Sequence, residues 1–313
     1  MSELCLVTGG AGFIGSHLVE ALTARGQRVR VLDNFSTGLP ANLAGIRPAP
    51  EIVEADLGDA EAVARALAKV NVVYHLAALA SVQRSVENPS ATHLTCATGT
   101  LHVLDAARRS GVRRLVYAAS SSAYGGLSSP EGQKEDAPIQ PLSPYAAAKL
   151  AGELYAQAFS ATYGLETVRL RFFNIFGPRQ RADSPYSGVI ALFIAAMTSG
   201  KAPTVYGDGL QSRDFTYVAN AVQALMKAAL APGVSGKVYN IGTGSSITVL
   251  GLVATLNHLL GTKLVPQHAS PRAGDARYSR ADINSARRDL GYDPDISFEE
   301  GLQRTVHWYR ESS

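Results

Sequence analysis

Cysteine is scarce in this chain of 313 residues, which contains Cys5 and Cys96 and no others. Because these two residues lie in no paired thiol motif, the sequence excludes a disulfide framework and favours a reducing compartment, the cytoplasm. The seven histidines also lack the close spacing of metal ligands, so we expect no metal site.

Long hydrophobic runs and a strong charge bias are missing as well. No apolar stretch is long enough to span a membrane, and no signal-peptide pattern precedes the first strand-like run, so we expect no membrane association. The formal net charge is +3 and the arginine pairs lie far apart, which argues against a nucleic-acid partner. With 46% hydrophobic residues, the chain can nevertheless bury a sizeable core.

Short β-branched runs alternate with helical patterns through the first half of the chain. The expected strands are Leu4–Thr8, Val29–Asp33, Ile52–Ala55, Val72–Leu76, Leu115–Ala119 and Thr167–Phe172. The expected helices are Phe13–Arg25, Ala60–Lys69, Pro89–Ser110 and Pro144–Tyr163. This alternation predicts an α/β fold of the Rossmann type, with a doubly wound parallel sheet.

A glycine-rich turn directly follows the first expected strand and opens the first expected helix. In it, Gly9 permits a tight turn, Gly12 lets a pyrophosphate approach the backbone, and Gly15 allows close helix–strand packing. Asp33 ends the second expected strand, where a carboxylate binds both ribose hydroxyls of adenosine and repels a 2′-phosphate. The pattern predicts an NAD site and disfavours NADP. The alternatives are an ordinary strand–helix turn and a helix cap at Asp33.

The strand–helix alternation ends after Gly177 and Pro178, where turn signals become frequent. We therefore expect residues 1–175 to form the NAD-binding domain. Residues 176–313 are expected to form mainly a smaller C-terminal α/β domain for substrate, with some of the chain crossing back to the first domain.

Tyr145 and Lys149 are one helical turn apart on one face of an expected helix. A tyrosine that acts as a base at neutral pH needs its pKa lowered by roughly 3 units, which a nearby lysine and a cationic nicotinamide can provide. Such a pair occurs by chance in many helices. Together with the glycine turn and Asp33, it indicates a catalytic pair.

Further motifs connect the chain to a known family. They are Ser120-Ser121-Ser122, Tyr124-Gly125, Arg171-Phe172-Phe173-Asn174, Gly177-Pro178-Arg179-Gln180, Tyr206-Gly207-Asp208-Gly209, Arg213-Asp214-Phe215 and Arg272-Ala273-Gly274-Asp275. With the residues above, the chain resembles the extended short-chain dehydrogenases/reductases, specifically the UDP-hexose 4-epimerases, over essentially its whole length. The resemblance implies that Ser120 is the catalytic serine, Tyr145 the base, and Lys149 the residue that lowers the pKa of the base and holds the nicotinamide ribose.

The same resemblance implies two sets of binding residues. The cofactor set comprises Gly9, Gly12, Phe13, Ile14, Gly15, Asp33, Asn34, Ser36, Thr37, Gly38, Asp56, Leu57, Leu76, Ala77, Ala78, Tyr145, Lys149 and Phe172. The UDP-sugar set comprises Ser81, Ser120, Ser121, Ser122, Tyr145, Asn174, Val205, Tyr206, Arg213, Arg272, Asp275 and Ser279. Arginines suit diphosphate oxygens and an aspartate suits ribose hydroxyls, although a surface salt bridge is the alternative for either arginine.

Two positions depart from the family pattern. Members usually have asparagine where this chain has Cys96, and aspartate where it has Asn220. The first change affects the expected hydrogen bonding behind Lys149, and neither change removes a catalytic group.

Related families differ just after the catalytic serine. The 4,6-dehydratases have Asp and Glu there, and the UDP-glucuronate decarboxylases have Glu two residues after it, whereas this chain has Ser121 and Ser122. Without the acid and base of dehydration, only hydride chemistry remains. The hypothesis is C4 epimerisation: Tyr145 removes the C4 hydroxyl proton as hydride passes to NAD, the 4-ketosugar turns, and hydride returns to its other face. NAD is regenerated in each cycle and is expected to stay tightly bound.

Two alternatives come from other functional classes: an NAD-dependent dehydrogenase of a small alcohol and a non-catalytic NAD-binding module. The complete set of Ser120, Tyr145 and Lys149 disfavours the module. The long C-terminal part with Arg213 and Arg272 disfavours a simple dehydrogenase.

The sugar preference is expected to depend on Ser279, which matches the family position beside the hexose C2 substituent. A small side chain there leaves room for an acetamido group, which favours UDP-GlcNAc and UDP-GalNAc, with UDP-glucose and UDP-galactose also accepted. A UDP-glucuronate 4-epimerase is the alternative, with Ser121 and Ser122 binding the carboxylate.

The resemblance also implies a homodimer. Family members pair the helix that bears the catalytic tyrosine with the preceding long helix, here Pro89–Ser110. Leu94, Leu101 and Leu104 give that helix an apolar stripe, although such a stripe is also typical of ordinary core packing.

Overall fold

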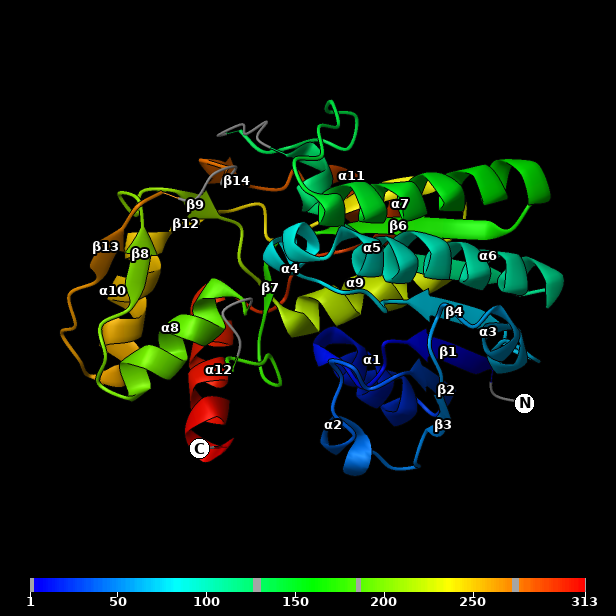
Figure 1. Ribbon diagram of the computed structural model, residues 1–313, viewed down its shortest axis with the longest axis horizontal. Helices are drawn as coiled ribbons and strands as arrows, with labels where there is room; N and C mark the ends of the chain where they lie inside the picture. Colours follow the sequence, from blue (N-terminus) through cyan, green and yellow to red (C-terminus); the bar gives the residue numbers. More distant parts are fainter. Residues whose placement is uncertain (1–2, 126–130, 184–186, 272–275, 313) are drawn as a thin grey trace.

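A parallel sheet of seven strands organises the chain (Figure 1). The structure, a computed structural model, describes residues 3–125, 131–183, 187–271 and 276–312. In sheet order, the strands are β11 (Lys237–Ile241), β6 (Glu166–Phe172), β5 (Arg114–Ser120), β4 (Val72–His75), β1 (Leu4–Thr8), β2 (Arg28–Asp33) and β3 (Glu51–Glu54). The predicted α/β fold with a doubly wound parallel sheet is confirmed.

Helices cover both faces of this sheet, as the right-handed crossovers of a parallel sheet require. One face packs on α1 (Phe13–Ala24) and α9 (Val218–Leu230). The other face packs on α3 (Ala60–Ala66), α6 (Gly99–Arg109) and α7 (Pro144–Tyr163). Side chains of strand β1 alternate between the two faces of the sheet. Cys5 and Val7 belong to the core on the α1 and α9 face, and Leu4 and Leu6 belong to the core on the α3, α6 and α7 face.

Strand β11 was not among the six expected strands. It follows Gly236 and precedes Gly242, and it pairs in parallel with β6 through Tyr239 and Leu170. The segment Val238-Tyr239-Asn240-Ile241 has β propensity, but only its long-range pairing distinguishes it from a short loop segment.

The helix expected at Pro89–Ser110 is divided into three parts. Helix α5 (Pro89–His93) runs into a π-helical turn, Leu94–Thr98, and then into α6. The Thr100 hydroxyl donates to the Cys96 carbonyl oxygen at 2.7 Å, so this turn shares one of its acceptors with a side chain. Isolated π-turns of this kind are frequent at functional sites.

A second group of helices and short strands lies at the carboxyl ends of the sheet strands (Figure 1). Its core lies among α8 (Val189–Thr198), α10 (Val249–Leu260) and α12 (Phe298–Ser312). Its short strands pair as β7 (Ile175–Phe176) with β10 (Thr216–Tyr217), β8 (Thr204–Tyr206) with β13 (Gln267–Ala269), and β9 (Ser212–Arg213) with both β12 (Ile247–Thr248) and β14 (Tyr278–Ser279). The division of the chain at residue 175 stays a prediction.

The other short elements are α2 (Ala41–Ala44), α4 (Val82–Glu87), α11 (Asn284–Leu290) and a 3-10 turn, Ser121–Tyr124. Within the part of the chain that the structure describes, no helix has both the length and the apolar character needed to cross a membrane.

Candidate active site

A cavity of about 580 Å³ opens where β1, β2 and β4 end. Its volume lies within the range of small-molecule and cofactor sites. It is lined by these predicted cofactor residues: Gly9, Gly12, Phe13, Ile14, Gly15, Asp33, Asn34, Ser36, Thr37, Asp56, Leu57, Leu76, Ala77 and Ala78. Ser81, predicted for the sugar, also lines it. The structure therefore brings together residues from four separate chain segments.

The glycine turn has the close backbone packing that its sequence predicts. A Cβ atom on Gly15 would lie 2.1 Å from the Gly9 carbonyl oxygen, and one on Gly9 would lie 2.8 Å from the Ala77 backbone. Gly9 also has a positive φ of 68°, which favours glycine. Helix α1 begins after Gly12 without a side-chain cap, so its first N–H groups face the cavity and suit an anionic phosphate.

Asp33 lies at the end of β2, as expected, and both of its carboxylate oxygens accept backbone hydrogen bonds. Oδ2 accepts from the Ala11 N–H and Oδ1 from the Phe35 N–H, each at 2.9 Å. Each oxygen keeps further lone pairs for a ribose hydroxyl. Next to it, the Asn34 amide donates to Asp56 at 2.6 Å, which joins the ends of β2 and β3.

Four residues of the predicted cofactor set do not line this cavity: Gly38, Tyr145, Lys149 and Phe172. A Cβ atom on Gly38 would lie 2.9 Å from Ala11, so this glycine packs the loop against the glycine turn. Phe172 ends β6, directly beside Ser120 in the strand register, and packs against the first core.

The three predicted catalytic residues meet at the start of α7. Ser143 caps this helix and Pro144 occupies its first turn, so Tyr145 and Lys149 lie on successive turns. Ser120 ends β5 and hydrogen-bonds Tyr145.

The Ser120 hydroxyl has a defined direction. Its oxygen accepts from the Ser122 N–H at 3.2 Å and from the Ser122 hydroxyl at 2.8 Å. Because these two bonds use acceptor positions, the single Ser120 proton remains for Tyr145.

Burial shifts the pKa values of both Tyr145 and Lys149. Burial raises the pKa of Tyr145 well above its usual value, and the Ser120 hydrogen bond opposes this shift. Burial lowers the pKa of Lys149 to about 8, opposed by Cys96 and Glu153. The protein residues alone raise the pKa of Tyr145, because the loss of solvation outweighs the favourable contacts. The predicted lowering also needs the cationic nicotinamide, so it stays a prediction.

Two contacts position Lys149. Its ammonium nitrogen lies 4.3 Å from the centre of the Tyr117 ring. The Tyr117 hydroxyl in turn donates to the Lys149 carbonyl oxygen at 3.0 Å. Tyr117 of strand β5 therefore contacts both the ammonium group and the backbone carbonyl of Lys149.

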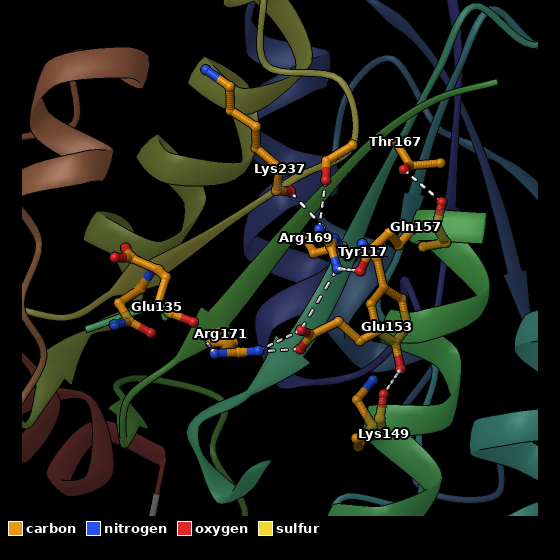
Figure 2. A network of polar contacts seen from close by, with 12 residues as sticks. Tyr117, Glu135, Lys149, Glu153, Gln157, Thr167, Arg169, Arg171 and Lys237 are labelled. Carbon is orange, nitrogen blue, oxygen red and sulfur yellow. Dashed lines mark hydrogen bonds and ion pairs between the residues drawn. The ribbon is translucent and has the colours of Figure 1, made fainter. Parts of the chain in front are cut away.

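A buried ion-pair network continues from Lys149 along α7 (Figure 2). Glu153, one turn beyond Lys149, accepts two hydrogen bonds from Arg171, at 2.6 and 3.0 Å. Arg169 lies 3.8 Å from the same carboxylate and donates to Gln157 at 3.0 Å. Two cations on β6 thus surround one carboxylate on α7, which ties the catalytic helix to the sheet.

The two departures from the family pattern have clear surroundings. Cys96 is fully buried against Ala97 and Ala148, within the π-turn beside α7. Asn220 donates to the Ile296 carbonyl oxygen at 2.8 Å and accepts from the Ile296 N–H at 3.1 Å. An amide makes both bonds, whereas an ionised carboxylate could accept from the Ile296 N–H but has no proton to donate to the Ile296 carbonyl oxygen.

Three predicted sugar residues meet at a second place, beyond the end of β6. The Asn174 amide lies 3.4 Å from the Ser279 hydroxyl, and Ser279 pairs with Arg213 between β14 and β9. Tyr206 is half-buried, whereas the Val205 side chain is fully buried in the second group's core. Ser121 and Ser122 lie in the 3-10 turn after β5. Arg272 and Asp275 lie outside the described residues.

Comparison with known proteins places these features in a family. The model of the NAD dependent epimerase/dehydratase family matches residues 5–242. This chain belongs to that family.

Similar proteins cover essentially the whole chain. A UDP-glucose 4-epimerase of Mycolicibacterium smegmatis is 37% identical over 98% of this chain and 99% of its own. The solved UDP-N-acetylglucosamine 4-epimerase of Methanobrevibacter ruminantium, in complex with UDP-N-acetylmuramic acid, has a TM-score of 0.94 and 37% identity over the full length of both chains. The solved UDP-glucose 4-epimerase of Thermus thermophilus, in complex with NAD, has a TM-score of 0.90 and 37% identity over 99% of this chain and 100% of that one.

Membership of the NAD-dependent epimerase/dehydratase family confirms the resemblance and the cofactor, NAD. The cavity residues fit this cofactor, because an open helix N-terminus, a close glycine turn and Asp33 line one continuous hollow.

One wall of the NAD cavity was missed by the sequence analysis. It is formed by Arg84 and by Arg179, Gln180, Arg181, Asp183, Ser187 and Gly188. Arg179 has a positive φ of 65°, and its guanidinium donates to Glu20 on α1 at 2.7 Å. The motif Gly177-Pro178-Arg179-Gln180 was a signal for this segment, but only the folded chain brings it against α1.

Among the described residues, no group of three or more His, Cys, Asp or Glu side chains is arranged to hold a metal ion.

Proposed function

We propose that this chain interconverts UDP-GlcNAc and UDP-GalNAc by inverting C4, and that it also accepts UDP-glucose and UDP-galactose. At the coarser level, the chain is an NAD-dependent UDP-sugar 4-epimerase, an isomerase. The preference for N-acetylated sugars rests on the position of Ser279, whose hydroxyl lies 3.4 Å from the Asn174 amide in the second group. A small side chain at this position supports a pocket with room for an acetamido group.

The catalytic roles follow from the contacts at α7. Tyr145 would take the proton from the sugar O4 and return it, with Ser120 directing its own proton at the phenol oxygen. NAD, when bound, would supply a reversible hydride acceptor for the sugar C4 and, in its oxidised form, a positive charge. We expect Lys149, whose ammonium nitrogen lies over the Tyr117 ring, to supply a second positive charge to this site.

The residues around Ser120 support epimerisation over dehydration. Elimination of water from the sugar needs an acid and a base beside the ketone-forming centre. Ser121 and Ser122 occupy those positions, and Ser122 is hydrogen-bonded to Ser120. Neither hydroxyl can replace a carboxylate, so a single proton-transfer group, Tyr145, serves both halves of the reaction.

Further parts of the proposal concern the state of the protein. We expect NAD to remain bound through each cycle, a homodimer, and a cytoplasmic location, which suits two buried cysteines without a disulfide partner. Residues 1–175 would form the NAD domain and residues 176–313 mainly the UDP-sugar domain.

The direct test incubates the purified protein with UDP-GlcNAc, UDP-glucose and UDP-glucuronate separately, with no added cofactor, and follows the sugar by proton NMR. We expect C4 inversion of UDP-GlcNAc and UDP-glucose. Conversion of UDP-glucuronate alone would replace the proposed sugar, with Ser121 and Ser122 as carboxylate ligands. Net oxidation without inversion would indicate a dehydrogenase, and no turnover of any sugar would contradict the activity.

A further inference from the structure

His75 is a buried histidine that the reaction scheme does not use. It ends β4, has no exposed surface, and its ring lies 5.6 Å from the Tyr117 ring. Its Nδ1 is 2.7 Å from the Thr8 hydroxyl and its Nε2 is 2.9 Å from the Thr100 hydroxyl. Both ring nitrogens therefore have a partner, and the partners determine where the proton lies.

The Thr100 side fixes one nitrogen as a donor. Thr100 gives its only hydroxyl proton to the Cys96 carbonyl oxygen at 2.7 Å. Its oxygen can then only accept from the ring, so Nε2 must have the proton.

The Thr8 side fixes the other nitrogen as an acceptor. The Thr8 hydroxyl oxygen accepts from the N–H groups of Leu76 and Ala77, each at 3.2 Å. Its own proton is free for Nδ1, whereas a protonated Nδ1 would compete with two donors for one oxygen. Burial, together with the nearby charge of Lys149, lowers the pKa of His75 to about 3, so the ring stays neutral.

These bonds join three segments that line the NAD cavity. Thr8 precedes the glycine turn, and the Leu76 and Ala77 amides belong to the loop that packs on Gly9. The π-turn held by Thr100 contributes Thr95 to the same cavity. The His75 ring also packs against the Tyr117 ring, and the Tyr117 hydroxyl donates to the Lys149 carbonyl oxygen.

We propose that His75, fixed as the neutral Nε2–H tautomer, is a positioning residue. It sets the spacing between the glycine turn, the loop after β4 and the π-turn, and thereby the affinity for NAD and the position of Lys149. The inference rests on NAD as the occupant of the cavity. It does not depend on which sugar the enzyme converts.

The tautomer can be read by ¹⁵N NMR of histidine-labelled holoenzyme, with the His75→Asn variant used for assignment. We expect a pyridine-type Nδ1 signal and a pyrrole-type Nε2 signal, unchanged between pH ~5 and pH ~8, where an ordinary histidine titrates. A protonated Nδ1, or a titration in this range, would overturn the proposal. This readout needs no substrate and is independent of the epimerase activity.

The positioning role is tested with Thr100→Val, which keeps the shape of the side chain and removes the hydroxyl. We expect bound NAD to exchange with isotope-labelled NAD about tenfold faster, as for the loss of a buried hydrogen bond. We also expect kcat to fall while KM for the UDP-sugar stays the same. Thr100→Ser retains the hydroxyl and is expected to restore both values.

Thr305→Val is the matched control. Thr305 is equally buried, and its hydroxyl also donates to the carbonyl oxygen four residues earlier, Gly301, at 2.7 Å, but it lies on α12. We expect similar thermal destabilisation in both valine variants and faster NAD exchange only in Thr100→Val. Equal NAD exchange in the two variants would refute the role of His75. If Thr100→Val does not fold, the tautomer measurement on the unmodified protein still decides the question.

Discussion

The Tyr145 oxygen is the single atom on which proton transfer depends in the proposed reaction. Tyr145→Phe removes only this oxygen, because the ring stays packed at the start of α7. We expect kcat to fall by about 10³-fold or more, while UDP-sugar binding, measured by calorimetry, changes little. Near-normal turnover would refute the assignment of the base.

The charge of Lys149 predicts a pH dependence. Burial lowers its pKa to about 8 from the usual 10.5, so the residue loses its proton as the pH rises through about 8. If catalysis needs the protonated form, activity falls above that pH. Lys149→Arg keeps a positive charge because the pKa of arginine exceeds ~12.

The measurement for Lys149 is the pH profile of kcat. We expect an alkaline decline in the unmodified enzyme, and a lower activity without this decline in Lys149→Arg. The same decline in both proteins would show that another group causes it.

Ser279 predicts the sugar preference. Ser279→Tyr places a bulky ring beside Asn174, where the acetamido group would lie in the proposed pocket. We expect activity on UDP-GlcNAc to be lost by steric exclusion and activity on UDP-glucose to be retained. Initial rates on both sugars test this, and an equal loss on both would contradict the pocket assignment.

At the scale of single elements, the contact of α1 with the end of β1 depends on the absence of a side chain at Gly15. Gly15→Ala would place a Cβ atom 2.1 Å from the Gly9 carbonyl oxygen, so the helix must move away from the turn. We expect about 1–3 kcal/mol of destabilisation, as for other overpacked sites, and loss of NAD from the purified protein.

Gly45→Ala is the control for this change, because a Cβ atom there meets no atom within 4 Å and its φ is −87°. Thermal unfolding and nicotinamide in the heat-released supernatant are the two measurements. NAD retained at the normal level in Gly15→Ala would show that the close packing is not needed for the site.

At the scale of the whole molecule, an exposed apolar surface supports the expected dimer. Leu94 in the π-turn is 56% exposed and Leu154 on α7 is 53% exposed, on two adjacent elements. Leu104 of the predicted stripe is instead fully buried in the core, and Leu101 packs partly against it. We therefore expect a partner chain to contact α7 and the π-turn more than α6.

We expect light scattering to give twice the mass of one chain, and Leu154→Lys to shift the protein towards the monomer. Leu230→Lys is the control, because Leu230 is 70% exposed but lies on α9, on the other face of the sheet. A monomeric unmodified protein would refute the dimer, and an equal effect of both substitutions would refute this surface.

Local sequence determined a large part of this protein. The positions of β1, α1 and α7 follow from hydrophobic periodicity and, for α7, from its cap at Ser143, which act within a few residues of the chain. The glycine turn and Asp33 predicted the NAD site because a backbone turn and a strand end require these residue types at fixed spacing. In the structure the glycine turn and Asp33 line one cavity, and their contacts with NAD stay a prediction.

Tertiary structure decided what depends on distant segments and on burial. β11 becomes a strand through its pairing with β6, and the residues after Gly177 become a cavity wall when Arg179 contacts Glu20. The direction in which the protein alone shifts the Tyr145 pKa was also decided by the fold, because desolvation depends on all the surrounding elements and not only on residues one helical turn away. Periodicity and spacing describe neighbours along the chain, whereas pairing, burial and electrostatic environment depend on neighbours in space.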